Sequence, residues 1–397
     1  MTTVEQSYAR ALYPRLAVLA VGLFAVATNG FLIAGILPSI AETLGVHASD
    51  VSYSISYYSI VVAVAAPAIS ILLPRISRTT LMASGLGLVA AGTVIAASAP
   101  DLLVFNAGRI VAALGGAALV PAATAAAAML APAQHRGRAI AFVAIGFTAA
   151  AAFGAPLGTA IASVGGWRLP LYGLAVIGAL TAGAIALFVR GIPFGEPVTA
   201  RRRFAVLANP RLLLTLATTL LVVSGFNVVY IFSSAITKPA TGGSTSLLAL
   251  LLLIAGVAGI LGNIVAGRLI DRFGSRRIAT LFFVAQIVLL SVLPLVVTNF
   301  VATCVVFALW GVAANASLLP VQDRLIAIDP ATSAVSLSWY STALYAGIAL
   351  APVLGAVILR LDNAELVPLA GAAAIAIALL VFHLGFMPVR SRQARPA

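Results

Sequence analysis

The stretch "GRLIDRFGSRR", residues 267–277, is the most charged short segment in a chain that has few charges. Five of its eleven residues are ionic, whereas Asp, Glu, Lys and Arg make up 8% of the 397 residues. A weaker copy, "SILLPRISRTT", lies 197 residues earlier at 70–80 and has Pro74 where the intact segment has Asp271. This segment, called the charged cassette below, therefore indicates a chain built from two related halves.

Long apolar runs surround both copies of the cassette. The chain is 62% hydrophobic, well above the roughly 45–50% that is typical of soluble domains. Runs of about 18 or more apolar residues can cross a hydrocarbon layer as helices, and their Ala- and Leu-rich composition without alternation argues against strands. We predict an all-α integral membrane protein with twelve transmembrane helices, near 16–37, 51–73, 80–98, 103–130, 139–163, 169–189, 212–236, 245–266, 278–298, 300–321, 333–359 and 365–387.

The positive charge follows the loops. The chain carries 23 Lys and Arg against 10 Asp and Glu, a net charge of +13. If the N-terminus is cytoplasmic, nineteen basic residues fall in the inner loops and tails, and only Arg168, Lys238 and Arg360 fall outside. The positive-inside rule then predicts both termini in the cytoplasm, and a topology signal explains the basic excess without nucleic acid. The preference for Arg over Lys favours a GC-rich bacterium, so we expect a multi-pass protein of the bacterial inner (cytoplasmic) membrane.

Small residues recur at almost the same offset as the cassette. The pairs, at offsets of 195–197 residues, are Ala150 with Gly347, Gly154 with Ala351, Gly158 with Gly355, Gly115 with Gly311, and Gly30–Phe31 with Gly225–Phe226. Two parallel six-helix repeats are a known plan of secondary transporters, whose substrate site lies between the halves near mid-membrane. We predict an N-terminal six-helix bundle over 1–190, a cytoplasmic linker over 191–211, and a C-terminal six-helix bundle with a short cytoplasmic tail over 212–397.

Three motifs and three longer stretches resemble those of a known transporter family, the major facilitator superfamily. The cassette fits its pattern G-x-x-x-D-R-x-G-x-R-R with Gly267, Asp271, Arg272, Gly274, Arg276 and Arg277. Arg109 followed by "IVAALGGAA" resembles its helix-4 motif, and Gly146 with "GAPLG" at 154–158 resembles the helix-5 motif of its antiporter branch. The stretches at 31–46, 256–272 and 345–355 resemble bacterial sugar, purine and chloramphenicol-type efflux permeases, in the twelve-helix drug/proton antiporter branch.

The resemblance implies that the cassette is a gating latch. In the family, the cassette holds the cytoplasmic ends of the two halves together, so Asp271 would face the start of helix 5 near Arg138–Ala139. A carboxylate is stabilised by the positive N-terminus of a helix. The first copy has lost this acid at Pro74, and we therefore hypothesise a latch supplied by the second half alone. The alternative is a tight turn whose arginines serve topology.

Helix 5 carries small residues that suit close packing. Gly146, Gly154 and Gly158 are spaced so that another helix can approach closely. The resemblance adds Pro156 and implies a bendable, leak-tight hinge against helix 11, as in exporters. Tight packing alone is the alternative.

Arg109 is the one formal charge deep in a predicted span. It lies roughly 10–12 Å below the outer edge of its helix, at 1.5 Å per residue. A buried guanidinium is costly unless it faces a cavity or a partner, and it is by default a functional-site candidate. We predict a role in substrate binding or proton coupling. The alternative is that Arg109 binds backbone carbonyls and braces helices 1 and 4.

All ten acidic residues fall at helix ends, in loops or in tails. Members of the antiporter branch often have a helix-1 glutamate where this chain has Gly30. A cavity with Arg109 and no acid disfavours organic cations, whose desolvation nothing offsets, and favours neutral or weakly anionic molecules. Coupling could use Arg109 with a titrating substrate, Asp323 near the inner rim, or no proton at all.

Helices 1, 4, 7 and 10 are expected to line the cavity. They carry the remaining candidate binding residues, which are Asn29, Asn227, Tyr230, Trp310 and Asn315. Asn offers hydrogen bonds, and Tyr and Trp offer flat stacking surface with a polar tip. Each could instead form hydrogen bonds between helices. A further aromatic set is placed at the entrance, namely Tyr57, Tyr58, Trp339, Tyr340 and Tyr345, and His383 is expected to pack structurally.

The sequence lacks paired acids, a Ser/His/Asp set, metal-ligand spacing and a phosphate-binding loop, so we expect no enzyme activity and no cofactor or metal. The predicted function is secondary active export of a small neutral or weakly anionic organic molecule (drug, sugar or nucleoside-like) by alternating access in exchange for protons, with the proton gradient as energy source. The alternative is a proton-independent facilitator or importer of the same fold. The expected partners are this substrate and the lipid bilayer, without nucleic acid, for a monomeric protein.

Overall fold

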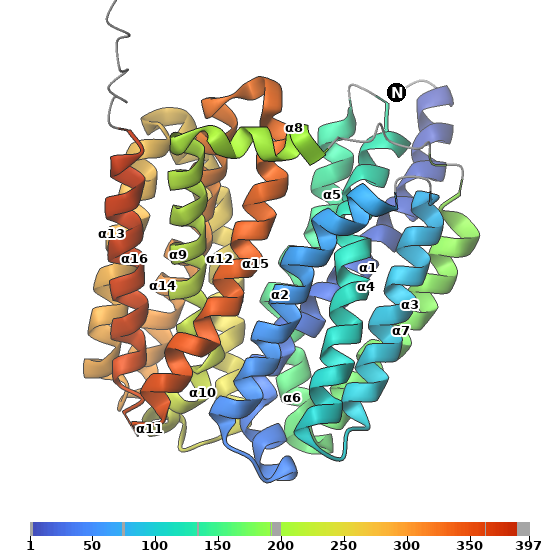
Figure 1. Ribbon diagram of the computed structural model, residues 1–397. Helices are drawn as coiled ribbons and strands as arrows, with labels where there is room; N and C mark the ends of the chain where they lie inside the picture. Colours follow the sequence, from blue (N-terminus) through green and yellow to red (C-terminus); the bar gives the residue numbers. More distant parts are fainter. Residues whose placement is uncertain are drawn as a thin grey trace, which may run out of the picture.

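The structure is a computed structural model that describes residues 3–73, 76–132, 135–190, 192, 200–361 and 363–386, and all the regular secondary structure in these residues is helical. Twelve spans in these residues are long and apolar enough to cross a membrane, which confirms the all-α integral membrane fold. The helices are α1 (Thr3–Leu44), α2 (Ala48–Leu72), α3 (Arg78–Ala97), α4 (Leu102–Leu130), α5 (Arg136–Ala149), the π-helix η2 (Ala150–Gly154), α6 (Ala155–Gly165), α7 (Arg168–Phe188), α8 (Ala200–Ala205), η3 (Val206–Ala208), α9 (Pro210–Ile231), α10 (Ser233–Ile236), α11 (Lys238–Thr241), α12 (Thr245–Phe273), α13 (Ser275–Val296), α14 (Phe300–Ile328), η4 (Pro330–Thr332), α15 (Ser333–Leu359) and α16 (Leu366–Leu384) (Figure 1).

Three spans continue about two turns beyond the end that the apolar pattern predicts, among them α12, which reaches Phe273 instead of 266. The pattern ends the first span near 37, but α1 continues through Pro38 to Leu44. It stops at Gly45, whose φ of 66° allows a Schellman cap in which Val46 N donates to Ala41 O at 3.0 Å. The tenth span likewise continues to Ile328 instead of ending at 321. Arg324, which the pattern assigns to an inner loop, therefore lies inside α14.

The charged cassette forms the end of α12, a one-residue connection and the start of α13. The connecting residue is Gly274, with φ 80° and ψ 151°. A side chain is strongly disfavoured at this positive φ, whereas glycine adopts it freely. Gly274 N donates to Ile270 O at 2.8 Å and closes the last turn of α12. The second glycine of the cassette is thus explained by backbone geometry alone.

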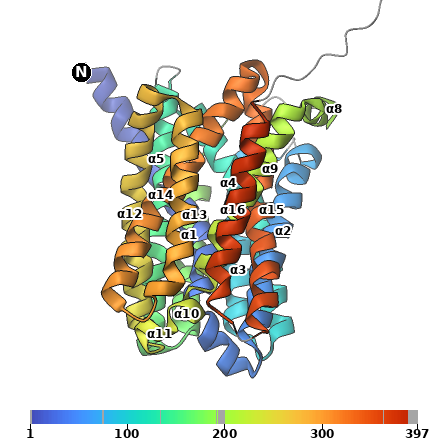
Figure 2. The same cartoon turned by 90° about the vertical axis from the view of Figure 1, so that its left-hand side faces the viewer.

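The helices before and after the linker form two groups that meet along a limited set of contacts. Figure 1 shows α1 to α7 on the right and α9 to α16 on the left, with α2 and α15 meeting between them. In the second group, α12 also contacts η2 and α6 of the first group. The helices α9, α10 and α12 of the second group contact α1. The start of α1 and the short helix α8 lie at one end of the molecule, called the α8 end, and α10 and α11 lie at the other, called the α10 end (Figures 1 and 2).

Candidate functional site

Arg109 on α4 is at the centre of a polar network among the first four helices. The side chain is 1% exposed. Its Nη1 donates to the backbone oxygen of Asn29 on α1 at 2.7 Å and to Asn29 Oδ1. Asn29 Nδ2 in turn donates to Thr93 Oγ1 on α3 at 2.6 Å. The guanidinium carbon lies 4.4 Å from the centroid of the Tyr58 ring on α2, at the distance of a cation–π contact.

The two roles predicted for Arg109, ligand binding and bracing of helices 1 and 4, involve different atoms of its side chain. Nη1 joins α4 to α1, as the bracing alternative predicts. Nε and Nη2 are buried and have no hydrogen-bond partner among the described residues, and the same is true of the hydroxyl groups of Tyr58 and Tyr230. Leaving buried donors unpaired costs roughly 1–3 kcal/mol each, and more when they are charged. These groups therefore favour a ligand that can accept hydrogen bonds.

The unpaired groups surround a small cavity between the two groups of helices. Its walls are formed by Val26, Ala27, Gly30, Phe31, Ala34, Ile55, Tyr58, Ser59, Arg109, Phe147, Asn227, Tyr230, Ile231, Tyr345 and Ile348. None of these residues is acidic, and Arg109 is the one charged residue among them. The cavity measures about 40 Å³, far below the roughly 300–1,000 Å³ of pockets that enclose drug-sized ligands. Such a ligand would require the two groups of helices to move apart.

The second group of helices contributes an aromatic wall. Tyr230 stacks on Phe226 with ring centroids 5.6 Å apart, and Phe226 stacks on Trp310 at 4.9 Å. Tyr230 faces the cavity, whereas Trp310 is 1% exposed and lies behind Phe226. Asn227 also lines the cavity while its Nδ2 donates to Val223 O of its own helix at 2.8 Å.

Of the six predicted binding residues, three line the cavity, namely Arg109, Asn227 and Tyr230. Asn29 orients Arg109, and Trp310 supports the aromatic wall. Asn315 donates to Gly311 O within α14 at 3.1 Å, and its amide lies where a side chain on Gly259 of α12 would be. Trp310 Nε1 is buried without a hydrogen-bond partner among the described residues, and Asn315 bonds within its own helix, so neither forms the interhelical hydrogen bond of the alternative.

Two tyrosines are placed differently from the sequence expectation. Tyr58 and Tyr345, assigned to the entrance, both line the cavity wall, and Tyr58 contacts Arg109 directly. The signal was present in the segment "SYSISYYS" at 52–59, where hydroxyl-bearing residues interrupt an otherwise apolar helix. Buried Ser56 in this segment donates to Ala349 O of α15 at 2.7 Å and joins the two halves beside the cavity.

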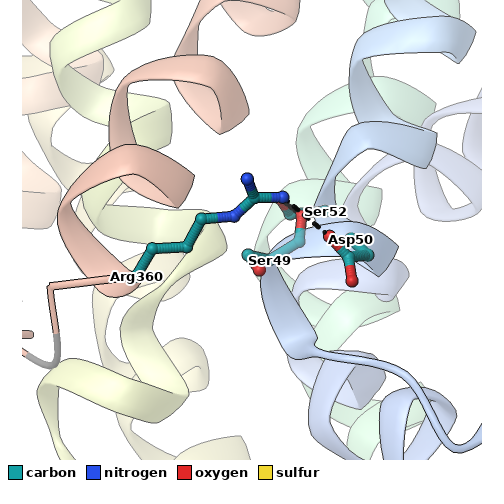
Figure 3. A network of polar contacts seen from close by, with 4 residues as sticks. All are labelled: Ser49, Asp50, Ser52 and Arg360. Atoms are coloured by element: carbon teal, nitrogen blue, oxygen red, sulfur yellow. Dashed lines mark hydrogen bonds and ion pairs between the residues drawn. The ribbon is translucent and has the colours of Figure 1, made fainter.

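Contacts between α2 and α15 join the two halves toward the α10 end of the molecule. Arg360, just after α15, forms an ion pair with Asp50 near the start of α2, with Nη2 3.0 Å from Oδ1. Figure 3 shows Arg360 reaching across to the first turn of α2, where Ser52 Oγ donates to Ser49 O at 2.6 Å. This is the one ion pair within the described part of the chain.

The cassette does not form its expected contact in this structure. Asp271 is exposed at the end of α12 and makes no ion pair with a described residue. At the α8 end, α5 is not among the helices that pack extensively against the second half. Arg272 lies over the Phe273 ring at 5.1 Å, and Arg276 and Arg277 are exposed in the first turn of α13. A Cβ on Gly267 would lie 3.9 Å from Leu319 Cδ2, an ordinary contact. Pro74, on which the asymmetric latch rests, lies outside the described residues.

The glycines of helix 5 face α1, so the predicted pairing with helix 11 is corrected. A Cβ on Gly146 would lie 1.9 Å from Ala20 O, and one on Gly154 or Gly158 would overlap Thr28 or Leu32. The three contacts keep one register because α1 and this span run in the same direction. On the opposite side, Ala152 lies against Gly256 of α12.

The same span contains a π-helix that the sequence pattern does not reveal. η2 covers Ala150–Gly154 and ends two residues before Pro156. A proline ring clashes with the carbonyl group four residues earlier, and a wider turn relieves that clash. Such π-bulges are frequent at functional sites, and η2 packs against both α1 and α12.

Comparison with known proteins places the chain among membrane transporters. A sequence profile of the Major Facilitator Superfamily matches residues 19–325. The chain is 30% identical to the uncharacterized MFS-type transporter YbcL of Bacillus subtilis, over 93% of this chain and 95% of that protein. It is 27% identical to the inner membrane transport protein YdhP of Escherichia coli O157:H7, over 96% and 97%.

Two solved structures share the fold. A crystal structure of a mutant of the nucleoside transporter NupG has a TM-score of 0.75 at 13% identity and covers 94% of this chain and 100% of that one. A bacterial homolog of the human lysosomal transporter Spinster, in an inward-facing and occupied conformation, has a TM-score of 0.71 at 17% identity over 97% of both chains.

Proposed function

Because the chain belongs to the Major Facilitator Superfamily, we propose that this transporter binds a small neutral or weakly anionic organic molecule in the Arg109 cavity. The proposal rests mainly on Nε and Nη2 of Arg109, two buried donor nitrogens that have no hydrogen-bond partner among the described residues. The cavity wall that contains Arg109 has no carboxylate. Guanidinium groups form strong charge-assisted hydrogen bonds with carboxylate or phosphate oxygens. Tyr58 and Tyr230 add two hydroxyl groups, and Phe31 and Tyr230 offer ring surfaces. A drug, sugar or nucleoside-like compound fits this combination.

The proposed mechanism is alternating access between the two halves. The α10 end is held by the Asp50–Arg360 ion pair and by the hydrogen bond from Ser56 to Ala349 O, whereas Asp271 at the α8 end forms no ion pair with a described residue. If the Arg-rich α8 end faces the cytoplasm, as the positive-inside rule indicates, the Asp50–Arg360 pair and the Ser56 contact join the two halves on the outer side of the cavity. The cassette would engage α5 when the α10 end opens. A differential stability of a few kcal/mol is enough to exchange the two populations.

Export in exchange for protons is the direction that we propose, on the strength of the antiporter-like helix 5. The proton gradient would then be the energy source, in a bacterial cytoplasmic membrane with both termini inside and the protein acting as a monomer. Because the cavity wall has no carboxylate, proton coupling would have to use Arg109 together with a titrating substrate, or Asp323 near the inner rim. The same observation supports the second candidate, a proton-independent facilitator or importer.

An accumulation assay tests the proposal. Cells that express the parent protein or Arg109→Ala are exposed to compounds sorted by charge, with and without a protonophore. Arg201→Ala, which changes an exposed cation on α8, is the matched control. We expect the parent and the control, but not Arg109→Ala, to deplete neutral or anionic compounds until the protonophore is added. Depletion that ignores the protonophore, or uptake, would favour the facilitator. Equal transport by Arg109→Ala and the parent would reject the cavity as the site.

A further inference from the structure

Arg324 is a second buried arginine, and it lies outside the transport cavity. It occupies the last turns of α14 and is 6% exposed. Its Nε donates to Thr215 Oγ1 on α9 at 3.2 Å, and the Thr215 hydroxyl donates to Arg211 O one turn earlier at 2.8 Å. Nη1 is buried without a hydrogen-bond partner in the part of the chain that the structure describes. This unpaired charged donor indicates an acceptor that the described protein groups do not supply.

The surroundings of Arg324 are basic. The guanidinium carbon of Arg324 lies 3.3 Å from the centroid of the Phe386 ring, and that of Arg276 lies 4.8 Å from the same centroid. Arg211 is exposed at the start of α9, one turn before Thr215, whose hydroxyl accepts from Arg324 and donates to Arg211 O. None of the three forms an ion pair with a described carboxylate, since the pair at Asp50 lies at the α10 end. Guanidinium groups that form no ion pair with a carboxylate attract an anion.

Arg276 is held beside Arg324 by hydrogen bonds to α16. Thr280 Oγ1 donates to Arg276 O at 2.8 Å, so its oxygen accepts from His383 Nε2 at 3.1 Å. His383 Nδ1 is then free to accept from Arg276 Nη2 at 3.3 Å. This arrangement requires a neutral imidazole, which adds no further charge. The predicted structural role of His383 thus becomes a definite one, namely orienting Arg276.

The cluster lies on the side of the second half that is remote from the other half. Figure 2 places α16 at the front, and α13 and α16 pack against each other on this side. Their outward apolar side chains, among them Leu281, Leu380 and Leu384, are 54%, 66% and 49% exposed. These side chains suit contact with lipid tails. The arginines follow directly beyond them at the α8 end, at the level where lipid head groups begin.

We infer that Arg211, Arg276 and Arg324 form a binding site for a phosphate group, and that its occupant is the head group of an anionic phospholipid. Guanidinium groups bind phosphate oxygens in pairs with good geometry, and basic pockets between transmembrane helices bind anionic head groups. The apolar surface beside the cluster favours a lipid over free phosphate, because it provides a place for the acyl chains. The site would tie α9, α13, α14 and α16 together whatever substrate is transported.

Thermal unfolding of the purified full-length protein in detergent tests the inference. Phosphatidylglycerol, phosphatidylcholine and inorganic phosphate are titrated separately, since a ligand that binds the folded state raises the Tm. The variants are Arg324→Gln and Arg276→Gln, and Arg277→Gln removes an exposed neighbouring charge as matched control. Because Arg276 is exposed, its variant keeps the test valid even if the Arg324 variant folds poorly.

We expect phosphatidylglycerol to raise the Tm of the parent and of Arg277→Gln. Arg276→Gln should require about tenfold more lipid for the same shift, as the loss of one charge-assisted contact implies, and Arg324→Gln should lose the shift. If inorganic phosphate raises the Tm as much as the lipid does, and Arg276→Gln and Arg324→Gln both weaken that shift, the site binds phosphate and the lipid assignment is overturned. An equal shift in all variants, or none in the parent, would overturn the site itself.

Discussion

The two buried arginines lie at opposite ends of corresponding helices. Helices α4 and α14 are the fourth helix of each repeat, related by an offset of 196 residues at Gly115 and Gly311. Arg109 lies toward the α10 end of α4 and faces the cavity between the halves, whereas Arg324 lies at the α8 end of α14 and faces the remote side of its own half. At this offset, Arg109 corresponds to Val305 and Arg324 to Ala128.

This comparison shows that the repeat sets the backbone plan but not the polar groups. A buried arginine in one half has an apolar residue at the equivalent place in the other, so each site is built once. The first half provides the charge of the proposed substrate site, and the second half provides the proposed lipid site. Substitution of Arg109 should therefore impair transport, whereas substitution of Arg324 should impair lipid binding.

The largest expected difference is between Arg109→Gln and Arg324→Gln. Loss of charge-assisted hydrogen bonds worth roughly 1.5–3 kcal/mol should weaken transport about 10- to 100-fold in Arg109→Gln, with the lipid-dependent Tm shift retained. Arg324→Gln should lose that shift and largely keep its substrate KM. Initial rates in proteoliposomes, together with Tm measurements, separate the two. If both variants lose both properties, the arginines belong to one coupled network and the comparison fails.

The fold could be predicted from the sequence because a bilayer imposes simple rules on helix length, apolar composition and loop charge. The errors lie at helix ends. Arg324 is buried because α14 continues to Ile328. The sequence predicted a loop there, because charged residues follow the end of the apolar run. The π-helix before Pro156 could not be predicted from the apolar pattern either, because it depends on how the backbone relieves the clash of the proline ring with an earlier carbonyl group.

The site was only partly predictable because helix faces cannot be read from one sequence. Arg109 was identified because a charge in an apolar run is rare. Trp310 and Asn315 had the expected residue types but face other helices, and Tyr58 and Tyr345 line the cavity because α2 and α15 cross between the halves. Whether Asp271 engages α5 depends on the conformational state, which a sequence does not specify.

Gly146 provides a comparison of packing in the two halves. A Cβ on Gly146 would lie 1.9 Å from the backbone oxygen of Ala20, which cannot move without the helix, whereas the corresponding residue of α15, Ala343, already carries a Cβ. Overpacking costs typically 1–3 kcal/mol, so Gly146→Ala should lower the Tm clearly. Ala343→Gly should cost about 1 kcal/mol or less through helix propensity. Equal Tm values for Gly146→Ala and the parent would show that α1 and α5 are not in firm contact.

Gly30 and its counterpart Gly225 test whether the missing carboxylate sets substrate charge. A Cβ on Gly30 would meet nothing within 4 Å, but one on Gly225 would lie 2.7 Å from Gly371 O. Gly30→Glu should therefore fold and place an acid in the Arg109 cavity, shifting preference toward cationic compounds by about tenfold, or ~1.4 kcal/mol. Gly225→Ala should change stability without changing preference. Competition between cationic and anionic compounds measures the shift, and an unchanged anion preference in Gly30→Glu would contradict the electrostatic argument.

The smallest expected effect is at the Asp50–Arg360 ion pair, which closes the end of the molecule nearest to Arg109. The side chains of Arg360 and Asp50 are 62% and 33% exposed, and exposed pairs contribute only about 0.2–1 kcal/mol. Asp50→Asn should therefore shift the balance toward opening of the α10 end by about 1.5- to 5-fold. Spin labels at Leu103→Cys and Leu361→Cys, on the two sides of that end, report the distance in a Cys304→Ser background. The phosphatidylglycerol-dependent Tm shift should stay the same, because Arg324 lies at the other end and within one half. A change in that shift would mean that closure at the α10 end is transmitted to the α8 end of the second half, and the two arginines would then respond to one motion.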